Sequence, residues 1–413
     1  MNNGWITCFL GEICDVTTGR RPNVKTNYPS NEMNIPVYGG NGIAWYTNEF
    51  LLNIDSPVIL TGRVGTLGTY FRVVGKCWVS DNALIIIPGT VDPDFLYYYM
   101  KMLPIESLNR GSTQPLLTQS DLKQIRLFIP KDIKEQKKIS NVLKILDAKI
   151  ELNTDINKNL EEQAQALFKS WFIDFEPFGG TMPEDWNEVS LSDIAEFTSG
   201  YSYKGTELQN SNIAMATIKN FDRSGGFKLD GFKEIVPSEK LKETQRVNLF
   251  DILVAHTDLT QNAEIIGNAE LLLNKSGYSD IILSMDLVKV TPKEHIVSPF
   301  LLALLLKNPV FKQHCLGYVN GTTVLHLSKK ALPEYKLWLP ADLSILNSLA
   351  VLIESLYKQI SSNIAESTYL ASIRDTLLPR LMSGEIDVSK VDISDPGCLD
   401  KLSFSDEGAD GDK

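Results

Sequence analysis

The chain has 413 residues, of which 43% are hydrophobic and 22% are charged, and its formal net charge is −11. This length allows two or three domains, and the composition is ordinary for a soluble globular protein. The most apolar window, residues 300–306, is far shorter than the roughly 20 residues of a membrane-spanning helix. The N-terminus lacks the apolar run of a secretory signal, and the five cysteines form no CxxC pair. These features predict a cytoplasmic protein with free thiols.

The negative charge is concentrated near the C-terminus. Residues 1–130 and 186–340 have net charges of 0 and −1, whereas residues from 385 onward hold nine acidic and three basic side chains. A protein that binds DNA alone usually presents a basic face. Near-neutral domains would need local basic clusters, or a partner that contacts the phosphates, in order to bind DNA.

The first region, residues 1–130, alternates short apolar runs with turn-forming residues, which indicates a strand-rich domain. The glycine-bearing segments 39–42 and 62–68 are predicted loops. Residues 95–102 are predicted to form a short helix. The clearest predicted strands are residues 58–61, 70–74 and 83–88.

A long helix is predicted within residues 131–178, because apolar residues recur at heptad spacing after Pro130. An aromatic cluster at its end is expected to pack on the adjoining domain, with a partner-docking patch as the alternative. The cluster comprises Phe168, Trp171, Phe172, Phe175 and Phe178. The seam comprises Ile139, Leu143, Leu146, Ile150, Asn153, Asn157, Leu160, Ala164 and Leu167.

Residues 179–341 repeat the first region. Strands are predicted at residues 251–256, 264–267 and 283–290, followed by a helix at 300–307. The repeat has two offsets: Trp5, Leu10, Ile13, Thr17 and Gly19 recur 181 residues later, and the segment from Gly111 to Pro130 recurs 210 residues later, from Gly321 to Pro340.

The offset of 210 residues continues into a second long helix, predicted within residues 342–385. Matched seams of more than three heptads are typical of a coiled coil, and helices of about 40 residues are roughly 60 Å long. One helix leaves each domain, so we expect the two helices to pair antiparallel; ordinary amphipathic helices on separate domains are the alternative. The second seam comprises Leu349, Ile353, Leu356, Ile360, Asn363, Ser367, Leu370, Arg374 and Leu377.

Asn153 and Asn363 occupy the same position in the two seams. A polar residue in such a seam lowers stability but fixes the register of the helices. Residues 386–413 are acidic, poor in large apolar residues and predicted to be disordered. The sequence therefore predicts an α+β fold, in which two strand-rich domains in a pseudo-two-fold arrangement are separated by an antiparallel coiled coil.

Motifs for catalysis are scarce. There is no glycine-rich cofactor loop, no Asp/Asn-Pro-Pro-aromatic methyltransferase motif, no phosphate-binding GK[ST] sequence and no metal-ligand spacing of histidines. One loose nuclease-like pattern exists, in which Asp94 and Asp121 would hold Mg²⁺ and Lys123 would stabilise charge. The aligned positions of the second copy hold Pro299, Ala331 and Pro333 instead, so the alternative is a solvated turn before a helix and a cap before a strand.

Six segments occur along the chain in a definite order: Tyr38-Gly-Gly-Asn-Gly-Ile, Thr61-Gly-Arg-Val-Gly-Thr, Gly111-Ser-Thr-Gln-Pro, Pro130 with Glu135-Gln136, Phe168 to Phe178, and Leu378 to Ile386. With these segments, the order of two matching domains and two matching helices resembles the specificity subunit of a type I restriction-modification system. The resemblance covers about residues 1–390. The second copy departs from the first, because it has Ala255-His-Thr-Asp in place of Gly62-Arg-Val-Gly and no match for Tyr38-Gly-Gly-Asn-Gly.

The resemblance implies that each domain recognises one half of a bipartite DNA target and that the helices set the gap between the halves. It also implies two methyltransferase subunits and restriction subunits as partners. The chain itself is expected to hold no metal or cofactor and to have no catalytic site. S-adenosylmethionine, Mg and ATP are expected on the partner subunits.

Residues that could contact DNA are polar or basic side chains on the loops, because such groups recognise base edges. Each of these side chains could equally be a solvated loop residue. For the protein as a whole, the remaining alternative is a coiled-coil scaffold with two protein-binding heads. In the first domain they are Arg20, Arg21, Asn41, Tyr46, Arg63, Thr66, Arg110, Ser112, Thr113 and Gln114. In the second they are Tyr201, Tyr203, Lys204, Lys219, His256, Thr257, Gln261, Asn262, Thr322, Thr323 and His326.

Overall fold

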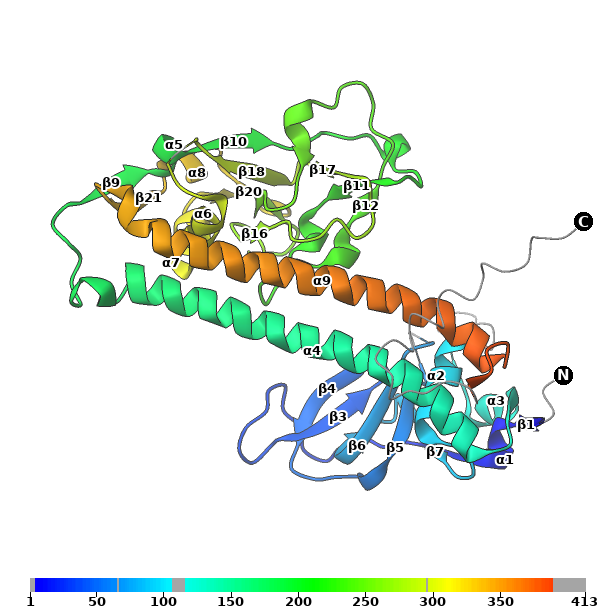
Figure 1. Ribbon diagram of the computed structural model, residues 1–413. Coiled ribbons are helices and arrows are strands. Elements are labelled where there is room, and N and C mark those ends of the chain that lie inside the picture. Colours follow the sequence, from blue (N-terminus) through cyan, green and yellow to red (C-terminus); the bar gives the residue numbers. More distant parts are fainter. Residues whose placement is uncertain (1–3, 65–66, 106–115, 295, 389–413) are drawn as a thin grey trace, which may run out of the picture. The chain divides into compact units, whose positions relative to one another are not determined.

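The computed structural model describes residues 4–64, 67–105, 116–294 and 296–388 (Figure 1). The predicted acidic tail falls almost entirely outside these residues. The described chain divides into two compact units. The first contains residues up to 150 together with residues 369–388, and the second contains residues 151–368.

The first unit is built on a six-stranded sheet in the order β2-β7-β5-β6-β3-β4. The pairing is antiparallel except between β3 and β6, which are parallel. The predicted strands at 58–61, 70–74 and 83–88 are confirmed within this sheet. Its strands are β2 (Cys14–Thr18), β3 (Ile35–Gly39), β4 (Gly42–Thr47), β5 (Leu52–Gly62), β6 (Tyr70–Val79) and β7 (Ala83–Pro88).

Three short helices and a two-stranded ribbon complete this unit. The predicted helix is α2 (Pro93–Met102): the Asp92 carboxylate accepts from the N–H of Phe95, and Pro93 occupies the first turn. Phe95, Leu96 and Met100 on its inner face are fully buried. The other elements are α1 (Leu10–Ile13), α3 (Gln119–Lys123), and the paired strands β1 (Trp5–Phe9) and β8 (Arg126–Pro130).

The second unit repeats this topology with shorter strands. One four-stranded sheet has the order β10-β18-β14-β16, which corresponds to β2-β7-β5-β6. Another has the order β12-β11-β17-β13, which corresponds to β4-β3-β6-β5 and keeps the one parallel pair. The long strands β5 and β6 are therefore each replaced by two strands in the second unit.

The elements of the second unit have these bounds. The strands are β9 (Trp186–Ser190), β10 (Ala195–Ser199), β11 (Ile213–Ala216), β12 (Lys233–Glu234), β13 (Arg246–Val247), β14 (Ile252–Ala255), β15 (Thr257–Asp258), β16 (Ala269–Leu271), β17 (Asp280–Leu283), β18 (Leu287–Pro292), β19 (Val319–Asn320), β20 (Leu325–Leu327) and β21 (Lys336–Pro340). The short helices are α5 (Leu191–Ile194), α6 (Pro299–Leu306), α7 (Pro309–Leu316) and α8 (Ala331–Glu334).

Two predicted strands of the second unit are wrong in detail. Residues 264–267 form a bend and a turn, because the Asp258 carboxylate accepts from the N–H groups of Ile265 and Ile266 and pulls the backbone away from strand geometry. Residues 283–290 are not one strand. A turn at Ser284–Asp286 separates β17 from β18, and the N–H of Leu287 closes it by donating to the Ser284 carbonyl at 3.0 Å.

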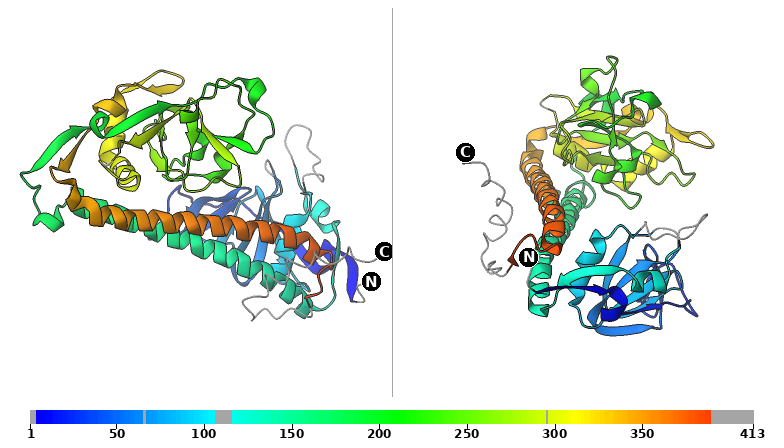
Figure 2. Two further views of the ribbon diagram at one scale, coloured as in Figure 1. Left: turned by 45° about the horizontal axis from the view of Figure 1, so that its top comes forward. Right: turned by 90° about the vertical axis from the view of Figure 1, so that its right-hand side faces the viewer.

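The two predicted long helices are α4 (Ile133–Phe172) and α9 (Asn347–Met382). Within each unit they lie side by side (Figures 1 and 2). In the first unit the start of α4 packs on the end of α9, with Ile139 and Leu143 in one core with Leu377. In the second unit the end of α4 packs on the start of α9, with Ala164 in one core with Ile353. This antiparallel pairing confirms the predicted seam, whose residues are all buried or half-buried.

The aromatic cluster at the end of α4 packs on the second domain, as expected. Phe172, Phe175 and Phe178 each make an edge-to-face contact with Trp186, at centroid distances of 5.5–5.6 Å. These contacts tie the helix end to the first strand of the domain. Among the described residues, no helix is long and apolar enough to cross a membrane.

Candidate nucleic-acid interface

Three loops of the first domain converge on Arg63. The N–H of Arg63 donates to the Asn82 carbonyl at 2.9 Å, and the Arg63 carbonyl accepts from the N–H of Leu117 at 2.9 Å. The β3–β4 turn lies against the same place, because a Cβ added to Gly40 would be 3.4 Å from the Asn82 carbonyl oxygen. Asn41 is exposed at the tip of that turn. The structure thus brings Asn41 and Arg63 to one loop cluster, at the end of β5.

Arg20 and Arg21 border this cluster from the segment after β2. Trp78 Nε1 donates to the Arg20 carbonyl at 2.6 Å, and the Arg20 guanidinium lies 5.3 Å from the Trp78 ring centroid. Arg21 is paired with Asp81 at 2.9 Å, but its side chain is 84% exposed, so the pair restrains it little. Both arginines line a surface hollow of about 480 Å³. Arg21 thus contacts the Ser80–Asn82 turn through Asp81.

The other predicted residues of the first domain lie away from this cluster or outside the described residues. Tyr46 is half-buried on the edge strand β4, and its backbone forms a bridge with Thr26, away from the β3–β4 turn. The remaining predicted residues lie outside the described residues: Thr66, Arg110, Ser112, Thr113 and Gln114.

In the second domain, equivalent backbone hydrogen bonds form around a different residue. We call this pair of backbone hydrogen bonds, made by Arg63 in the first domain and by His256 in the second, the framework. The N–H of His256 donates to the Asp286 carbonyl at 2.8 Å, and the His256 carbonyl accepts from the N–H of Leu327 at 2.9 Å. His256 therefore takes the place of Arg63, and Asp286 takes the place of Asn82. The N–H of Ser80 donates to the Tyr38 carbonyl at 2.9 Å in the first domain, and the N–H of Ser284 donates to the Ala216 carbonyl at 3.1 Å in the second.

A small sheet gathers further predicted residues around His256. Its order is β15-β20-β19, and it places Thr257 opposite His326. Thr257 is buried, and its hydroxyl donates to the Asp286 carboxylate at 3.1 Å. The side-chain amide of Gln261 donates to the Thr322 carbonyl. The exposed members of this group are Gln261, Asn262, Thr322, Thr323 and His326.

The charge state of His256 follows from its surroundings. Burial lowers its pKa, and the nearby His326 and Lys329 lower it further, while the Asp286 carboxylate opposes them. The imidazole is therefore kept neutral at neutral pH. A neutral imidazole both donates and accepts hydrogen bonds, whereas the guanidinium of Arg63 only donates.

The remaining predicted residues of the second domain lie in two other segments. Lys219 is exposed, three residues after Ala216, and so matches Asn41, which lies three residues after Tyr38. Tyr201 is 3% exposed, and its hydroxyl donates to the Glu207 carboxylate at 2.6 Å, which holds its loop in place. Lys204 is exposed and Tyr203 is half-buried in that loop.

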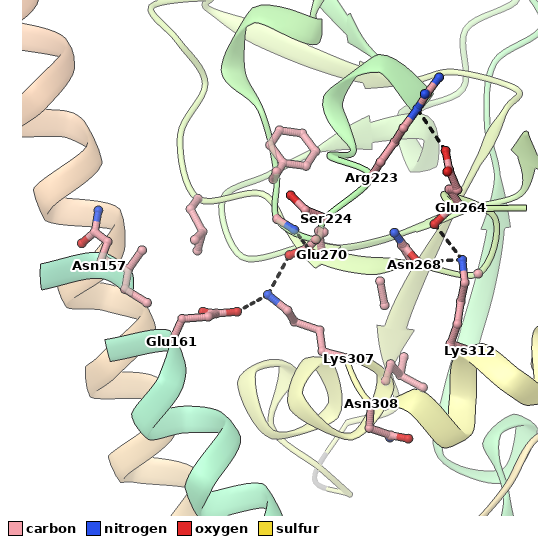
Figure 3. A pocket seen from close by; sticks show the side chains of 18 of the residues that line it. Asn157, Glu161, Arg223, Ser224, Glu264, Asn268, Glu270, Lys307, Asn308 and Lys312 are labelled. Carbon is pink, nitrogen blue, oxygen red and sulfur yellow. Dashed lines mark hydrogen bonds and ion pairs between the residues drawn. The ribbon is translucent and has the colours of Figure 1, made fainter. Parts of the chain in front are cut away.

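A hollow of about 680 Å³ in the second unit lies between α4, α9 and the loops of the domain (Figure 3). The lysine side chains that line it already have partners within the protein. Lys307 is paired with Glu161 of α4 and, at 2.7 Å, with Glu270. Burial alone would lower the pKa of Lys307, but the carboxylates of Glu270 and Glu161 raise it well above its usual value. The Lys312 ammonium donates to three oxygen atoms. The pair between Lys307 and Glu161 joins α4 to the domain.

The nuclease-like residues have structural partners. Asp94 is paired with Arg72 and, at 2.7 Å, with Lys144. Burial would raise the pKa of Asp94, but hydrogen bonds from Lys144 and Arg72 lower it below its usual value. Asp121 caps α3 through Thr118, and Lys123 lies 3.5 Å from Asp15. Within the described part of the chain, no group of three or more His, Cys, Asp or Glu residues could hold a metal ion.

The turn residues Asn82 and Asp286 were not predicted as candidate contacts. The signal that could have found them is the equal length of residues 80–88 and 284–292, each of which runs from a serine to a proline. That match aligns Asn82 with Asp286, because each lies two residues after the serine.

The chain matches the family model described as "Type I restriction modification DNA specificity domain" over residues 2–162 and again over residues 183–366. The specificity subunit of the type I restriction enzyme MjaIX of Methanocaldococcus jannaschii is 25% identical over 94% of both chains. That of the enzyme HindI of Haemophilus influenzae is 26% identical over 94% of this chain and 92% of the relative.

Among solved structures, the S subunit of a type I restriction-modification system from M. genitalium has a similar fold. The TM-score is 0.59 at 18% identity, and the match covers 92% of this chain and 97% of that one. Each family match covers one of the two domains together with part of the long helix that follows it. This chain belongs to the family of type I restriction-modification DNA specificity subunits.

Proposed function

We propose that each of the two domains recognises one half of a bipartite DNA target. The observation that carries this proposal is the shared framework around Arg63 and His256. The backbone hydrogen bonds at the two positions are equivalent, whereas the side chains they present differ in charge and hydrogen bonding. A fixed backbone with exchanged side chains suits the recognition of two different half-sites by two domains of one design.

The partners in this proposal are two methyltransferase subunits and, in the full complex, restriction subunits. The methyltransferase subunits would carry S-adenosylmethionine and transfer the methyl group to adenine, and the restriction subunits would use Mg and ATP. This chain would supply sequence recognition and no catalysis. The near-zero net charge of residues 1–130 and 186–340 fits a protein whose partners contribute phosphate contacts.

The two helices would set the gap between the half-sites. Asn153 is buried in the seam, and its amide nitrogen donates to the Glu366 carboxylate at 2.8 Å and to the Ser367 hydroxyl at 3.2 Å. Asn363 donates to the Asn157 side chain at 2.8 Å. A buried polar layer of this kind penalises any shift of one helix along the other. We propose that this layer keeps one gap length.

Adenine methylation measured by single-molecule sequencing tests the proposed function. Cells would express this chain with its cognate methyltransferase subunit, or the methyltransferase alone. We expect a bipartite methylated motif in the first culture and none in the second. If the two proteins copurify but no motif appears, the chain is a scaffold with two protein-binding heads, and the proposal is wrong.

A further inference from the structure

In each domain a further side chain lies beside Arg63 or His256. It belongs to the turn residue whose carbonyl accepts a hydrogen bond from that residue, which is Asn82 in the first domain and Asp286 in the second. The carbonyl groups of Asn82 and Asp286 accept from the N–H groups of Arg63 and His256, at 2.9 and 2.8 Å. Each turn residue therefore sits beside the candidate contact of its own domain. Because the hydrogen bonds match, the two side chains leave the backbone at equivalent points.

The two side chains are available to a ligand to different degrees. Asn82 is exposed, and within the described part of the chain its side-chain amide has no hydrogen-bond partner. Asp286 is half-buried; one of its carboxylate oxygens accepts from the Thr257 hydroxyl at 3.1 Å. That bond fixes the carboxylate in orientation and leaves its second oxygen for another donor.

The chemistry of the two groups differs in one respect that matters for base recognition. An asparagine amide both donates and accepts, so it can pair with N7 and N6 of adenine. An ionised aspartate only accepts, so it can take a hydrogen bond from N4 of cytosine, and it is repelled by the acceptor atoms of guanine. The two side chains thus have the same shape but favour different bases.

We propose that Asn82 and Asp286 are specificity-determining residues, one for each half-site. Asn82 selects adenine at one position of the half-site bound by the first domain. Asp286 selects cytosine at one position of the other half-site. This inference rests on the proposed function, because it assumes that the frameworks face DNA.

The test exchanges the two side chains in the full chain, expressed with its cognate methyltransferase, as Asn82→Asp and Asp286→Asn. Both changes keep the side-chain shape, so the turn and its backbone hydrogen bonds are retained. Methylation of all genomic sites by single-molecule sequencing reports each base position separately. Asn82→Asp should lower the methylation of sites that carry the original base at one position of one half-site, by about 10-fold or more. Asp286→Asn should do the same at one position of the other half, and the gap should stay the same.

Two control variants match these changes in charge. Asn53→Asp lies near the start of β5, the end opposite to Arg63, and Asp185→Asn lies just before β9; both positions are exposed. Both controls should retain the wild-type motif. Asn82→Ala provides a second test, and it should remove the preference at the same position that Asn82→Asp alters.

The results that would overturn the inference are distinct from failure of the proposed function. If the wild type gives a bipartite motif and both exchanges leave it unchanged, the turn side chains contact no base. If an exchange weakens methylation evenly at all positions, the side chain acts through charge alone, and the inference is equally wrong. If the wild-type chain gives no motif, the proposed function fails and the inference fails with it.

Discussion

At the scale of single residues, the framework depends on a close approach that only glycine allows. A Cβ added to Gly200 would lie 1.8 Å from the carbonyl oxygen of Ser284, and one added to Gly19 would lie 2.2 Å from that of Val79. Each glycine thus lets the segment after the second strand of its domain pass directly against a turn, the Ser80–Asn82 turn in the first domain and the Ser284–Asp286 turn in the second. Their recurrence at an offset of 181 residues is explained by this contact.

Gly200→Ala should therefore destabilise the second domain. Because the clash is with backbone, it cannot be relieved by rotating a side chain, and the free energy of unfolding should fall by about 1–3 kcal/mol or more. Denaturant unfolding measures the change. Gly205→Ala is the matched control, since nothing lies within 4 Å of the added Cβ, and its effect should stay within about 0.5 kcal/mol. Equal stabilities of the two variants would contradict the proposed close approach.

The protonation of His256 predicts a pH dependence of stability. Its pKa in the folded state is lowered from 6.5 by burial, then by His326 and Lys329, against the opposing effect of Asp286. Above pH 6.5 the imidazole is neutral in both the folded and the unfolded state, so it costs nothing. Below that pH the unfolded state binds a proton that the folded state binds less readily, and stability falls.

His256→Gln should remove this part of the acid sensitivity. The unfolding midpoints of wild type and variant are measured between pH 7.5 and 5.5. Over this range the wild type should lose more stability than the variant as the pH falls. A wild-type protein that loses no more stability than the variant on acidification would show that His256 is not held neutral by the fold.

At the scale of elements, the helices were the part best predicted from the sequence. Their heptad seams depend on local spacing, which the structure reproduces in the burial of residues such as Ile139 and Leu349. Strands of the first domain were predicted because β5, β6 and β7 carry continuous apolar runs. The predicted strand at 264–267 was wrong because the Asp258 carboxylate, seven and eight residues earlier, accepts hydrogen bonds from the N–H groups of Ile265 and Ile266, and the apolar pattern of the segment does not indicate this contact.

The candidate site was predictable by type but not by arrangement. The sequence indicated Arg63 as a basic residue on a glycine-bearing loop. It indicated His256 as a polar residue on the segment that replaces this loop in the second copy. The sequence already aligned His256 with Arg63 and Asn82 with Asp286, but the position of each turn residue beside Arg63 or His256 became evident only from the backbone hydrogen bonds that join these segments. The likeness of Lys219 to Asn41 was hidden for the same reason, because the two sequences around them share no motif.

Asn153→Leu tests the proposed part of the buried polar layer. Leucine would bury more apolar surface in the seam, so the free energy of unfolding should rise by about 1 kcal/mol. The methylated motif should then show more than one gap length, because the register is no longer fixed. The control is Asn159→Leu on an exposed face of the same helix, which should keep a single gap. If Asn153→Leu alters the stability but leaves one unchanged gap length, the buried polar layer does not set the spacing between the half-sites.

At the scale of the whole molecule, one chain carries the same recognition framework twice. In each copy a backbone N–H donates to a turn carbonyl and a carbonyl accepts from a leucine N–H, while the side chains at the centre differ. The two family matches, over residues 2–162 and 183–366, follow the same division. In the proposed function, the two copies act on different halves of one DNA target.

The most direct measurement compares the methylation motifs of Arg63→Ala and His256→Ala, each expressed with the cognate methyltransferase and sequenced beside the wild type. Removing a base contact should cost about 1–3 kcal/mol of discrimination at its position. We expect Arg63→Ala to relax base specificity at a position in one half of the motif and His256→Ala to do so at a position in the other half. Relaxation of the same half by both variants, or of neither half by either, would contradict this expectation.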